Sequence, residues 1–446
     1  MKLRRLLVFF CFFAAAFAPD YAAATSVKAL NVVSGAQVWF AEDHTVPMIA
    51  LVASLPSGSA YDPSAKAGTA AFAAALLDEG AGNLDSAAFQ DALAKHAIQL
   101  SVEPGRDTMT VTLVTLSSSA KEAFRLLGLA LAHPRFDAEA VARVRAQILT
   151  ELEEESENPA SVAEKSFYSL YFGPHAYGHS LTGDQRSLGA VTPEDLRGFA
   201  RTHWVRGGLK IALAGDTNAS AAANLIRSTF GPLAADAPAL PPAPGRVGAP
   251  GLHILPMPVP QPAAIFALPG LLRSDPDFLA GYVANYILGG GSSSRLTQDV
   301  REKRGLTYDI STDLVVYRRS GILLGAVATR SDAMRQTIAV VRETLRKFIS
   351  DGPTDQELAD AKTYLNGSFP IAYASDVGLA AQLNAFQQVG LGIDYLDKRA
   401  GLINAITLAD VRRATRRLFD PSRLTVVVAG TLPMQKAENS DVLPSP

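Results

Sequence analysis

Cysteine is nearly absent from this sequence of 446 residues, since Cys11 is the only one, and an internal disulfide is therefore excluded. An excess of basic residues is also absent, because 41 Lys and Arg stand against 43 Asp and Glu. That balance argues against a nucleic-acid-binding protein. After residue 18 no uninterrupted apolar run reaches the length of about 20 residues that spans a bilayer.

The first 24 residues have the pattern of an export signal. Three basic residues within the first five precede an apolar run at 6–18, and Ala22–Ala24 supply small residues for cleavage. The run is too short for a stable membrane span; a buried N-terminal helix is the alternative interpretation. We predict a signal peptide at 1–24 and an exported mature chain without cysteine. A bacterial periplasm fits such a disulfide-free protein best.

Histidine is scarce, and its spacing forms no metal-binding motif. The seven histidines contain no His-x-x-Glu-His in either direction. His175 and His179 are four residues apart, which on a helix would suit a metal, but the surrounding GPHAYGHS has the composition of a loop. Ser292–Ser294 lack the Gly-x-Ser-x-Gly of a serine nucleophile. These residues alone therefore predict no complete catalytic site.

What the sequence does contain is an internal repeat. The strand sequence LKIALAGD at 209–216 returns as LTVVVAGT at 424–431, 215 residues later. Thr192 and Thr407, at the same spacing, each open a helix and are followed three residues on by an acid, as in a capping box. Two motifs in one register indicate a duplication, although two generic helix–strand units can resemble each other by chance.

Proline concentrates between the repeats, with six residues in 232–252. We predict an extended linker there, separating an N-terminal half at 25–231 from a C-terminal half at 253–435. The polar residues 436–446 are expected to form a frayed tail. Strand and helix patterns mix in both halves, which favours an α+β fold in which helices cover one face of each sheet.

Hydrophobic periodicity and turn residues predict the elements of each half. The N-terminal half should contain a hairpin of 29–33 with 37–41, strands at 46–55 and 108–113, and helices at 69–77, 86–96, 120–132 and 138–155. The C-terminal half should repeat this order, with strands at 263–268 and 322–328 and helices at 277–288 and 332–349.

Five groups of residues, in order along the chain, resemble the pitrilysin/insulinase-like zinc peptidases, the M16-type family with an inverted zinc motif. They are Pro56–Asp62 with Gly68–Phe72 and Asp78–Gly80; Phe89–Val102 with Arg106 and Asp107; Ile148–Leu152 with Glu157–Pro159; Gly173–Gly178; and Leu288–Leu296 with Arg301–Tyr308. The resemblance covers about residues 28–435. It implies two homologous α+β domains, each a mixed, mostly antiparallel sheet with helices packed on one face.

The resemblance places the zinc motif where this chain has no metal ligand. The family's two histidines and its glutamate correspond to Ala71, Ala75 and Ala74, and alanine offers no lone pair to a metal and no proton to a substrate. The third ligand corresponds to Glu151 and a supporting acid to Val144. Glu151 is equally explained by the solvated acidic helix end at 151–157. We therefore expect no metal in this chain and no peptidase activity of its own.

The C-terminal half keeps two residues that the family uses at its zinc site. The resemblance implies that Arg301 and Tyr308 bind substrate and stabilise an oxyanion, and both side chains are hydrogen-bond donors. The simpler interpretation is a surface arginine and a tyrosine that begins a strand. Because some members are heterodimers with zinc on one chain and the Arg/Tyr pair on the other, the resemblance implies a non-catalytic subunit. Its partner would be a homologous zinc-bearing subunit, and the two would enclose a peptide.

Two further segments are candidates for peptide contact. Gly289, Gly290 and Gly291 match the position of a glycine-rich loop in related non-catalytic subunits, although a helix C-cap with a turn is the simpler interpretation. Gln99, Leu100 and Ser101 lie in a predicted edge strand that would bind an extended peptide by strand addition; ordinary sheet structure is the alternative. Two other functions stay open: a peptide-binding or structural chamber protein without a proteolytic partner, and an enzyme of different chemistry.

Overall fold

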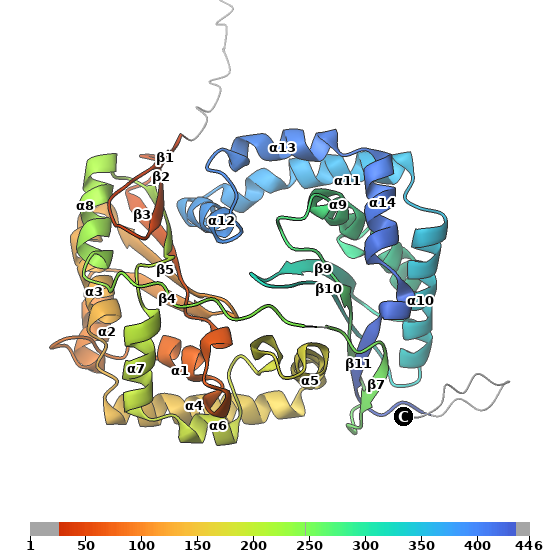
Figure 1. Ribbon diagram of the computed structural model, residues 1–446, viewed down its shortest axis with the longest axis horizontal. Helices are drawn as coiled ribbons and strands as arrows, with labels where there is room; N and C mark the ends of the chain where they lie inside the picture. The colour runs from red at the N-terminus through yellow and green to blue at the C-terminus, as the bar shows by residue number, and fades with distance from the viewer. Residues whose placement is uncertain (1–25, 246, 434–446) are drawn as a thin grey trace, which may run out of the picture.

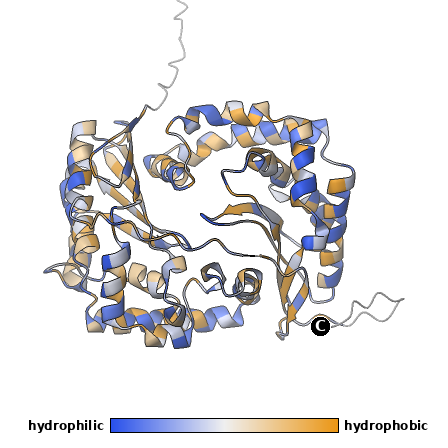
Figure 2. Cartoon of the chain, in the orientation of Figure 1, coloured by the Kyte–Doolittle hydropathy of each residue, from blue (hydrophilic) through white to orange (hydrophobic). Residues whose placement is uncertain are grey.

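The computed structural model describes residues 26–245 and 247–433 and folds them into two halves that face each other (Figure 1). The predicted signal peptide at 1–24 and tail at 436–446 lie outside the described residues. Among the described residues, no helix has the length and apolar character needed to cross a membrane. Figure 2 shows mainly apolar residues along the strands, whereas the helices carry both apolar and hydrophilic residues.

The N-terminal half mixes strands and helices in the predicted order. Its strands are β1 (Val27–Ala29), β2 (Gln37–Glu42), β3 (Met48–Leu55), β4 (Gln99–Pro104), β5 (Met109–Leu116) and β6 (Lys210–Gly215). Its helices are α1 (Thr69–Ala75), α2 (Ser86–Lys95), α3 (Ala120–Ala132), α4 (Ala138–Glu157), α5 (Pro159–Phe172), α6 (Gln185–Ala190), α7 (Pro193–His203) and α8 (Ala219–Phe230).

The C-terminal half repeats this arrangement. Its strands are β7 (Gly251–Leu255), β8 (Ala263–Pro269), β9 (Ile310–Val316), β10 (Gly321–Ala328) and β11 (Thr425–Ala429). Its helices are α9 (Phe278–Gly289), the π-helical turn η5 (Thr297–Glu302), α10 (Met334–Ser350), α11 (Asp355–Gly367), the 3-10 helix η6 (Phe369–Tyr373), α12 (Asp376–Gln388), α13 (Tyr395–Ala405) and α14 (Leu408–Leu418).

The two sheets have one topology. Their strand orders are β1-β2-β6-β3-β5-β4 and β7-β11-β8-β10-β9, and these agree when β2 is matched to β7 and β6 to β11. The pairs β2–β6 and β7–β11 are parallel, and the other pairs are antiparallel. The predicted α+β class with mixed, mostly antiparallel sheets is confirmed. The repeated sequences form β6 and β11, which occupy the corresponding inner position in the two sheets.

The helices before these strands also begin alike. The Thr192 hydroxyl accepts the Asp195 N–H at 3.2 Å, and the Asp195 carboxylate accepts the Thr192 N–H at 2.8 Å. Thr407 and Asp410 form the same capping box before β11, with distances of 3.2 and 3.0 Å. Hydrogen bonds to these carboxylates, chiefly from Lys66 to Asp195 and from Thr407 to Asp410, lower both pKa values to about 2. Both predicted capping boxes are therefore present.

Each sheet is covered on both faces. The helices of each half cover one face, as predicted. The other face is covered by a helix from the opposite half: α12 packs on β3 and β6, and α5 packs on β8 and β11 (Figure 1). Central strands that are buried on both sides need continuous apolar sequences, and this explains the unbroken apolar runs of β6 and β11.

Several predicted boundaries differ from the structure by one to three residues, as for β5, and three differences have a clear structural reason. The first strand of the hairpin is β1 at Val27–Ala29 rather than 29–33, because the chain from Leu30 to Gly35 turns back toward β2. Gly251 and Leu252, assigned to the linker, belong to β7 because they pair with β11. Leu233, also assigned to the linker, packs in the N-terminal core.

Candidate functional site

The position of the inverted zinc motif is helix α1, which a buried acid caps. Gly68 precedes the helix with a φ of +93°, and the Asp62 carboxylate accepts the N–H groups of Gly68 at 2.7 Å and Ala70 at 2.8 Å. Burial raises the pKa of Asp62 to about 7, although the two N–H donors act in the opposite direction. A Cβ on Gly68 would lie 2.5 Å from the Thr182 carbonyl oxygen, so the turn requires glycine.

The three motif positions on α1 hold methyl groups. Ala71 and Ala74 are buried, at 6% and 2% exposure, whereas Ala75 is exposed. Ala71 and Ala75 share one face of the helix, where two imidazoles would stand for zinc. With no donor atom on any of the three, these residues do not fit a zinc ion.

Glu151, at the position of the family's third metal ligand, does not replace the ligands missing from α1. Glu151 lies on α4, is exposed, and accepts a hydrogen bond of 3.0 Å from the Gln147 side chain one turn earlier. Val144, where the supporting acid would be, is buried in the N-terminal core. Within residues 26–245 and 247–433, no group of three or more His, Cys, Asp or Glu side chains could hold a metal ion.

Arg301 and Tyr308 lie at the two ends of one short connection in the C-terminal half. Arg301 is in η5 with its side chain half-exposed, and its Nε lies 3.5 Å from Glu302 Oε1. The Gly305 N–H donates to the Arg301 carbonyl at 2.8 Å, and a φ of +59° at Gly305 turns the chain toward β9. Tyr308 precedes β9 and is 90% exposed.

The connection that carries Tyr308 is anchored on both sides of it. The buried Thr307 hydroxyl lies 2.8 Å from the carbonyl oxygens of both Asp309 and Ala328. The Leu306 N–H donates to the Val300 carbonyl at 3.0 Å. A fixed backbone therefore presents an exposed phenol, and nothing in the described chain accepts a hydrogen bond from it.

The glycine run has a packing role. Gly289 ends α9, and a Cβ there would lie 2.3 Å from Thr312 Oγ1 of the neighbouring strand β9. A Cβ on Gly290 would lie 2.7 Å from the Tyr286 Cα, and one on Gly291 would lie 3.0 Å from the Tyr286 hydroxyl. The Gly290 N–H caps α9 by donating to the Tyr286 carbonyl. The run is thus a helix end that fits closely against β9 and Tyr286.

Strand β4 is the last strand of its sheet and pairs only with β5. Gln99 and Ser101 are exposed and Leu100 is half-buried, so the predicted edge strand is present. A surface groove of about 620 Å³ runs beside it and is lined by all three residues. Val377 from α12 of the opposite half also lines this groove.

Of the two histidines that are four residues apart, His175 contacts the linker. The chain at Ala176–Gly178 is a 3-10 turn, and His175 Nδ1 accepts the Tyr177 N–H at 3.1 Å. His175 Nε2 lies 2.8 Å from the Pro242 carbonyl oxygen in the linker. Burial lowers the pKa of His179. The predicted loop is confirmed, and both rings have surroundings unsuited to a shared metal.

One polar cluster was not predicted from the sequence. His44 Nδ1 lies 2.6 Å from Asp216 Oδ1, and the Ser117 hydroxyl donates to Asp216 Oδ2 at 2.7 Å. Its parts lie 172 and 99 residues apart along the chain, so no local motif reveals it. Serine and histidine both bind the aspartate rather than each other, so the cluster lacks the nucleophile–base hydrogen bond of a serine hydrolase.

Fold and site together define a class of protein: a two-domain zinc-peptidase-like chain whose motif helix has no metal ligands. Comparison with known proteins agrees. Residues 38–185 match the family model described as insulinase (peptidase family M16), and residues 190–365 match the model of the peptidase M16 inactive domain. This chain belongs to peptidase family M16, and it is an inactive homologue in which alanines replace the inverted zinc motif.

Individual relatives are similar over most of this chain. A solved peptidase M16 inactive domain from Pseudomonas fluorescens superimposes with a TM-score of 0.87 and 28% identity, covering 92% of this chain and 99% of that one. An uncharacterized zinc protease of Streptomyces coelicolor is 29% identical over 66% of this chain and 65% of its own length, just under two thirds. The non-peptidase homolog YmxG of Helicobacter pylori is 22% identical over 88% of this chain and 91% of its own length.

Proposed function

We propose that this chain is the non-catalytic subunit of an exported heterodimeric zinc metallopeptidase. It would supply Arg301 and Tyr308 to the zinc site of a homologous partner subunit and help to enclose a peptide substrate. The zinc and the water-activating glutamate would belong to the partner. The observation that carries the proposal is the contrast between a motif helix without ligands and a C-terminal connection that presents two hydrogen-bond donors to solvent.

The exposure of Tyr308 supports donation to another molecule. A large aromatic side chain that is 90% exposed, and that has no hydrogen-bond acceptor in the described chain, contributes little to the stability of its own fold. Its backbone is nevertheless fixed by Thr307 and Gly305. Donors held in place before the substrate arrives are what oxyanion stabilisation requires.

Arg301 lies on the same connection, in a π-helical turn, a geometry frequent at functional sites. Its pairing with Glu302 is an exposed contact of 3.5 Å, which holds the guanidinium weakly. Arg301 is therefore available to bind a carbonyl or carboxylate oxygen of a substrate. Together the phenol and the guanidinium provide donors for an oxyanion that develops beside a partner's metal.

The free edge of β4 supports a contribution to substrate binding. An extended peptide that pairs with this edge would run along the groove beside Gln99, Leu100 and Ser101. The same edge is compatible with a peptide-binding chamber protein that has no proteolytic partner, which is the alternative function. Tight binding of peptides by the isolated chain, with no partner recovered from the periplasm, would favour that alternative.

The test is reconstitution with a homologous subunit that carries His-x-x-Glu-His, followed by measurement of peptide cleavage. Cleavage by the mixture should exceed that of either chain alone. Arg301→Ala and Tyr308→Phe should each lower kcat by about 10²–10³-fold, the effect of removing one oxyanion donor. Their effect on subunit association, measured by sedimentation, should be small, because each substitution removes only donors at the site.

Two residues of the same types, the exposed Arg330 and the half-buried Tyr373, provide controls. Arg330→Ala removes an exposed arginine at the end of β10, and Tyr373→Phe removes a phenol hydroxyl from η6. Neither should change cleavage. If Arg301→Ala and Tyr308→Phe leave the rate of the mixture unchanged, the donated-site proposal is wrong. Fractionation of cells should place the mature chain in the periplasm, and recovery from the cytoplasm with 1–24 uncleaved would contradict export.

A further inference from the structure

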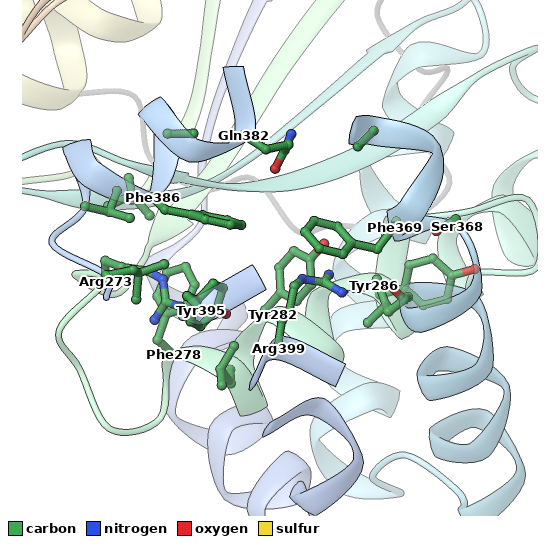
Figure 3. Close-up of a pocket in the computed structure, with 18 of the residues that line it drawn as sticks. Arg273, Phe278, Tyr282, Tyr286, Ser368, Phe369, Gln382, Phe386, Tyr395 and Arg399 are labelled. Carbon is green, nitrogen blue, oxygen red and sulfur yellow. Dashed lines mark hydrogen bonds between the residues drawn. The ribbon is translucent and has the colours of Figure 1, made fainter. Parts of the chain in front are cut away.

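A cavity of about 520 Å³ lies within the C-terminal half, apart from the Arg301–Tyr308 connection. It is a pocket open to solvent and is lined mainly by residues of α9, α11, η6, α12 and α13. Figure 3 shows Gln382 and Phe386 on one side of it and Phe278, Tyr282, Tyr395 and Arg399 on the other. Its size lies in the range of about 300–1,000 Å³ that is typical of small-ligand sites.

Seven of the 19 residues that line the cavity are aromatic. Six of them come from α9, η6, α12 and α13: Phe278, Tyr282, Tyr286, Phe369, Phe386 and Tyr395. The Phe386 and Tyr395 rings meet edge to face at 4.9 Å, and Tyr286 stacks on Tyr364 at 4.9 Å. Contacts of this kind hold the rings in place, so the cavity presents a preformed apolar surface to a flat or branched group.

Two arginines line the same cavity without an acidic partner. Arg399 is 7% exposed, lies 4.0 Å above the Phe369 ring and donates to the Leu365 carbonyl at 2.9 Å. Arg273 lies 4.5 Å above the Phe278 ring and donates to the Tyr395 hydroxyl at 2.9 Å. In the part of the chain that the structure describes, no carboxylate lies within ion-pair distance of either guanidinium.

The acids nearest to Arg273 along the chain are engaged elsewhere. Asp275 pairs with Arg417 at 2.6 Å, and Asp277 pairs with Arg413 at 2.8 Å. A buried guanidinium without a counter-charge is costly, and each arginine here uses only one hydrogen bond to a neutral oxygen. The cavity therefore combines apolar walls with an uncompensated positive charge.

We propose that this cavity binds a carboxylate that is attached to an aromatic or branched apolar group. The ring would lie between Phe386 and the rings of α9 and α13, and the carboxylate would pair with Arg273, the more exposed of the two guanidiniums. Two sources have this chemistry: a free aromatic acid and the C-terminal residue of a peptide.

The surroundings of Arg273 leave room for a larger ligand. A second cavity, of about 330 Å³, shares Arg273, Val316 and Val389 with the first, and its mixed lining includes Asp107, Ser274, Arg318 and Gln388 beside apolar residues. A peptide whose last residue enters the aromatic cavity would continue along this second one. The proposed binding needs no partner subunit, so it stands or falls separately from the donated-site proposal.

The test is calorimetric titration of the isolated full chain with two matched pairs of ligands. The first pair is N-acetyl-phenylalanine and its amide, and the second is a tetraglycyl-phenylalanine peptide with a free or amidated C-terminus. Each acid should bind at least about tenfold more tightly than its amide, because only the acid forms a charge-assisted pair. If the peptide acid binds more tightly than N-acetyl-phenylalanine, the source is a peptide C-terminus; the reverse order identifies a free aromatic acid.

Two variants locate the site. Arg273→Gln should abolish the preference for acid over amide. Ala385→Phe, at an exposed position of α12 that lines the cavity, should fill it and weaken both acids at least about tenfold without removing any core contact. Arg330→Gln, outside the cavity, should change nothing. Equal affinity for acid and amide, or no saturable binding at millimolar concentrations, would overturn the proposal, as would acid affinity that both cavity variants leave intact.

Discussion

Helices α5 and α12 occupy the same place in the two halves of the repeat, and each crosses to cover the sheet of the other half. They do so with different chemistry. Helix α5 presents Phe167, Tyr168, Tyr171 and Phe172 to β8, β10 and β11. Its only side-chain hydrogen bond to the other half is between the hydroxyls of Tyr168 and Tyr317, at 2.8 Å, among the residues that the structure describes. This contact is mainly apolar packing.

Helix α12 adds buried amides to its apolar contact. The Asn384 side chain is 1% exposed and donates to the carbonyl oxygens of Val52 at 3.2 Å and Lys210 at 3.0 Å. The Gln387 side chain, equally buried, donates to the carbonyls of Gln37 and Ile211, both at 3.1 Å. Hydrogen bonds depend on direction more than apolar packing does, so α12 is fixed in register on its sheet.

The comparison teaches that the duplicated topology determines where each crossing helix lies, whereas its side chains determine how it is held. An aromatic face tolerates small sliding movements, whereas a set of amides that each reach a particular carbonyl does not. Substitutions on α5 should therefore act through lost packing volume, and substitutions on α12 through unsatisfied polar groups.

The largest change in the free energy of unfolding is expected for the buried aromatic residues of α5. Phe167→Ala removes a fully buried ring from the α5 contact and should lower the free energy of unfolding by about 3–5 kcal/mol, measured by guanidinium titration. Leu170→Ala on the exposed side of the same helix, at 38% exposure, is the matched control and should cost about 0.5 kcal/mol or less. Equal effects of the two substitutions would show that α5 is not held by its buried rings.

Much of the fold was predictable from local pattern. Helices 120–132 and 138–155 have clear periodicity and are found at Ala120–Ala132 and Ala138–Glu157. The crossing of α5 and α12 was not predictable, because it depends on which sheet face remains uncovered once both halves have folded. The strand pattern indicated burial on both sides but not the identity of the covering helix.

The candidate site also has features that could be predicted from the sequence and features that could not. Alanine at 71, 74 and 75 excludes a zinc site on chemical grounds alone, and this could be read from the residues once the resemblance had aligned them. The predicted roles of Arg301 and Tyr308 depended wholly on the resemblance, because exposed arginines and tyrosines are common in any protein. The aromatic cavity left no sequence signal, because Arg273 and Tyr395 are 122 residues apart and meet only in the folded chain.

A second difference between the halves lies in the acid before the first helix of each. Burial raises the pKa of Asp62 before α1 to about 7, whereas the Arg417 side chain lowers the pKa of Asp275 before α9. Between its unfolded value near 4 and about 7, Asp62 holds a proton in the folded state that the unfolded chain has lost. Stability should therefore fall as pH rises through this window, by up to about 4 kcal/mol.

The effect of Asp275 on stability has the opposite pH dependence. Its stabilising contribution is present above its unfolded pKa and is lost as pH falls through the lower folded pKa. Guanidinium unfolding measured at pH 5 and pH 8 separates the effects of Asp62 and Asp275. Asp62→Asn should remove most of the loss between these pH values, and Asp275→Asn should leave it in place. An unchanged pH difference in Asp62→Asn would contradict a protonated Asp62 in the folded chain.

The smallest change in the free energy of unfolding is expected for a buried amide of α12. Asn384→Ala removes both amide donors and leaves the Ser54 hydroxyl, which donates to Asn384 at 2.5 Å, without that partner. The free energy of unfolding should fall by about 1–3 kcal/mol, the cost of leaving buried polar groups unpaired. Gln382→Ala, on a partly exposed face of the same helix, should cost about 0.5 kcal/mol or less.

A double-mutant cycle distinguishes hydrogen bonding from packing at Asn384. If the amide acts through hydrogen bonds, the loss in Asn384→Ala should shrink in a Ser54→Ala background, because that background no longer has a hydroxyl to leave unsatisfied. Additive losses would instead show that the Ser54 bond contributes little, and would leave the bonds to the Val52 and Lys210 carbonyls as the cause. An Asn384→Leu variant of similar volume that is as stable as the parent chain would show that packing alone holds α12. The difference between the two crossing helices would then disappear.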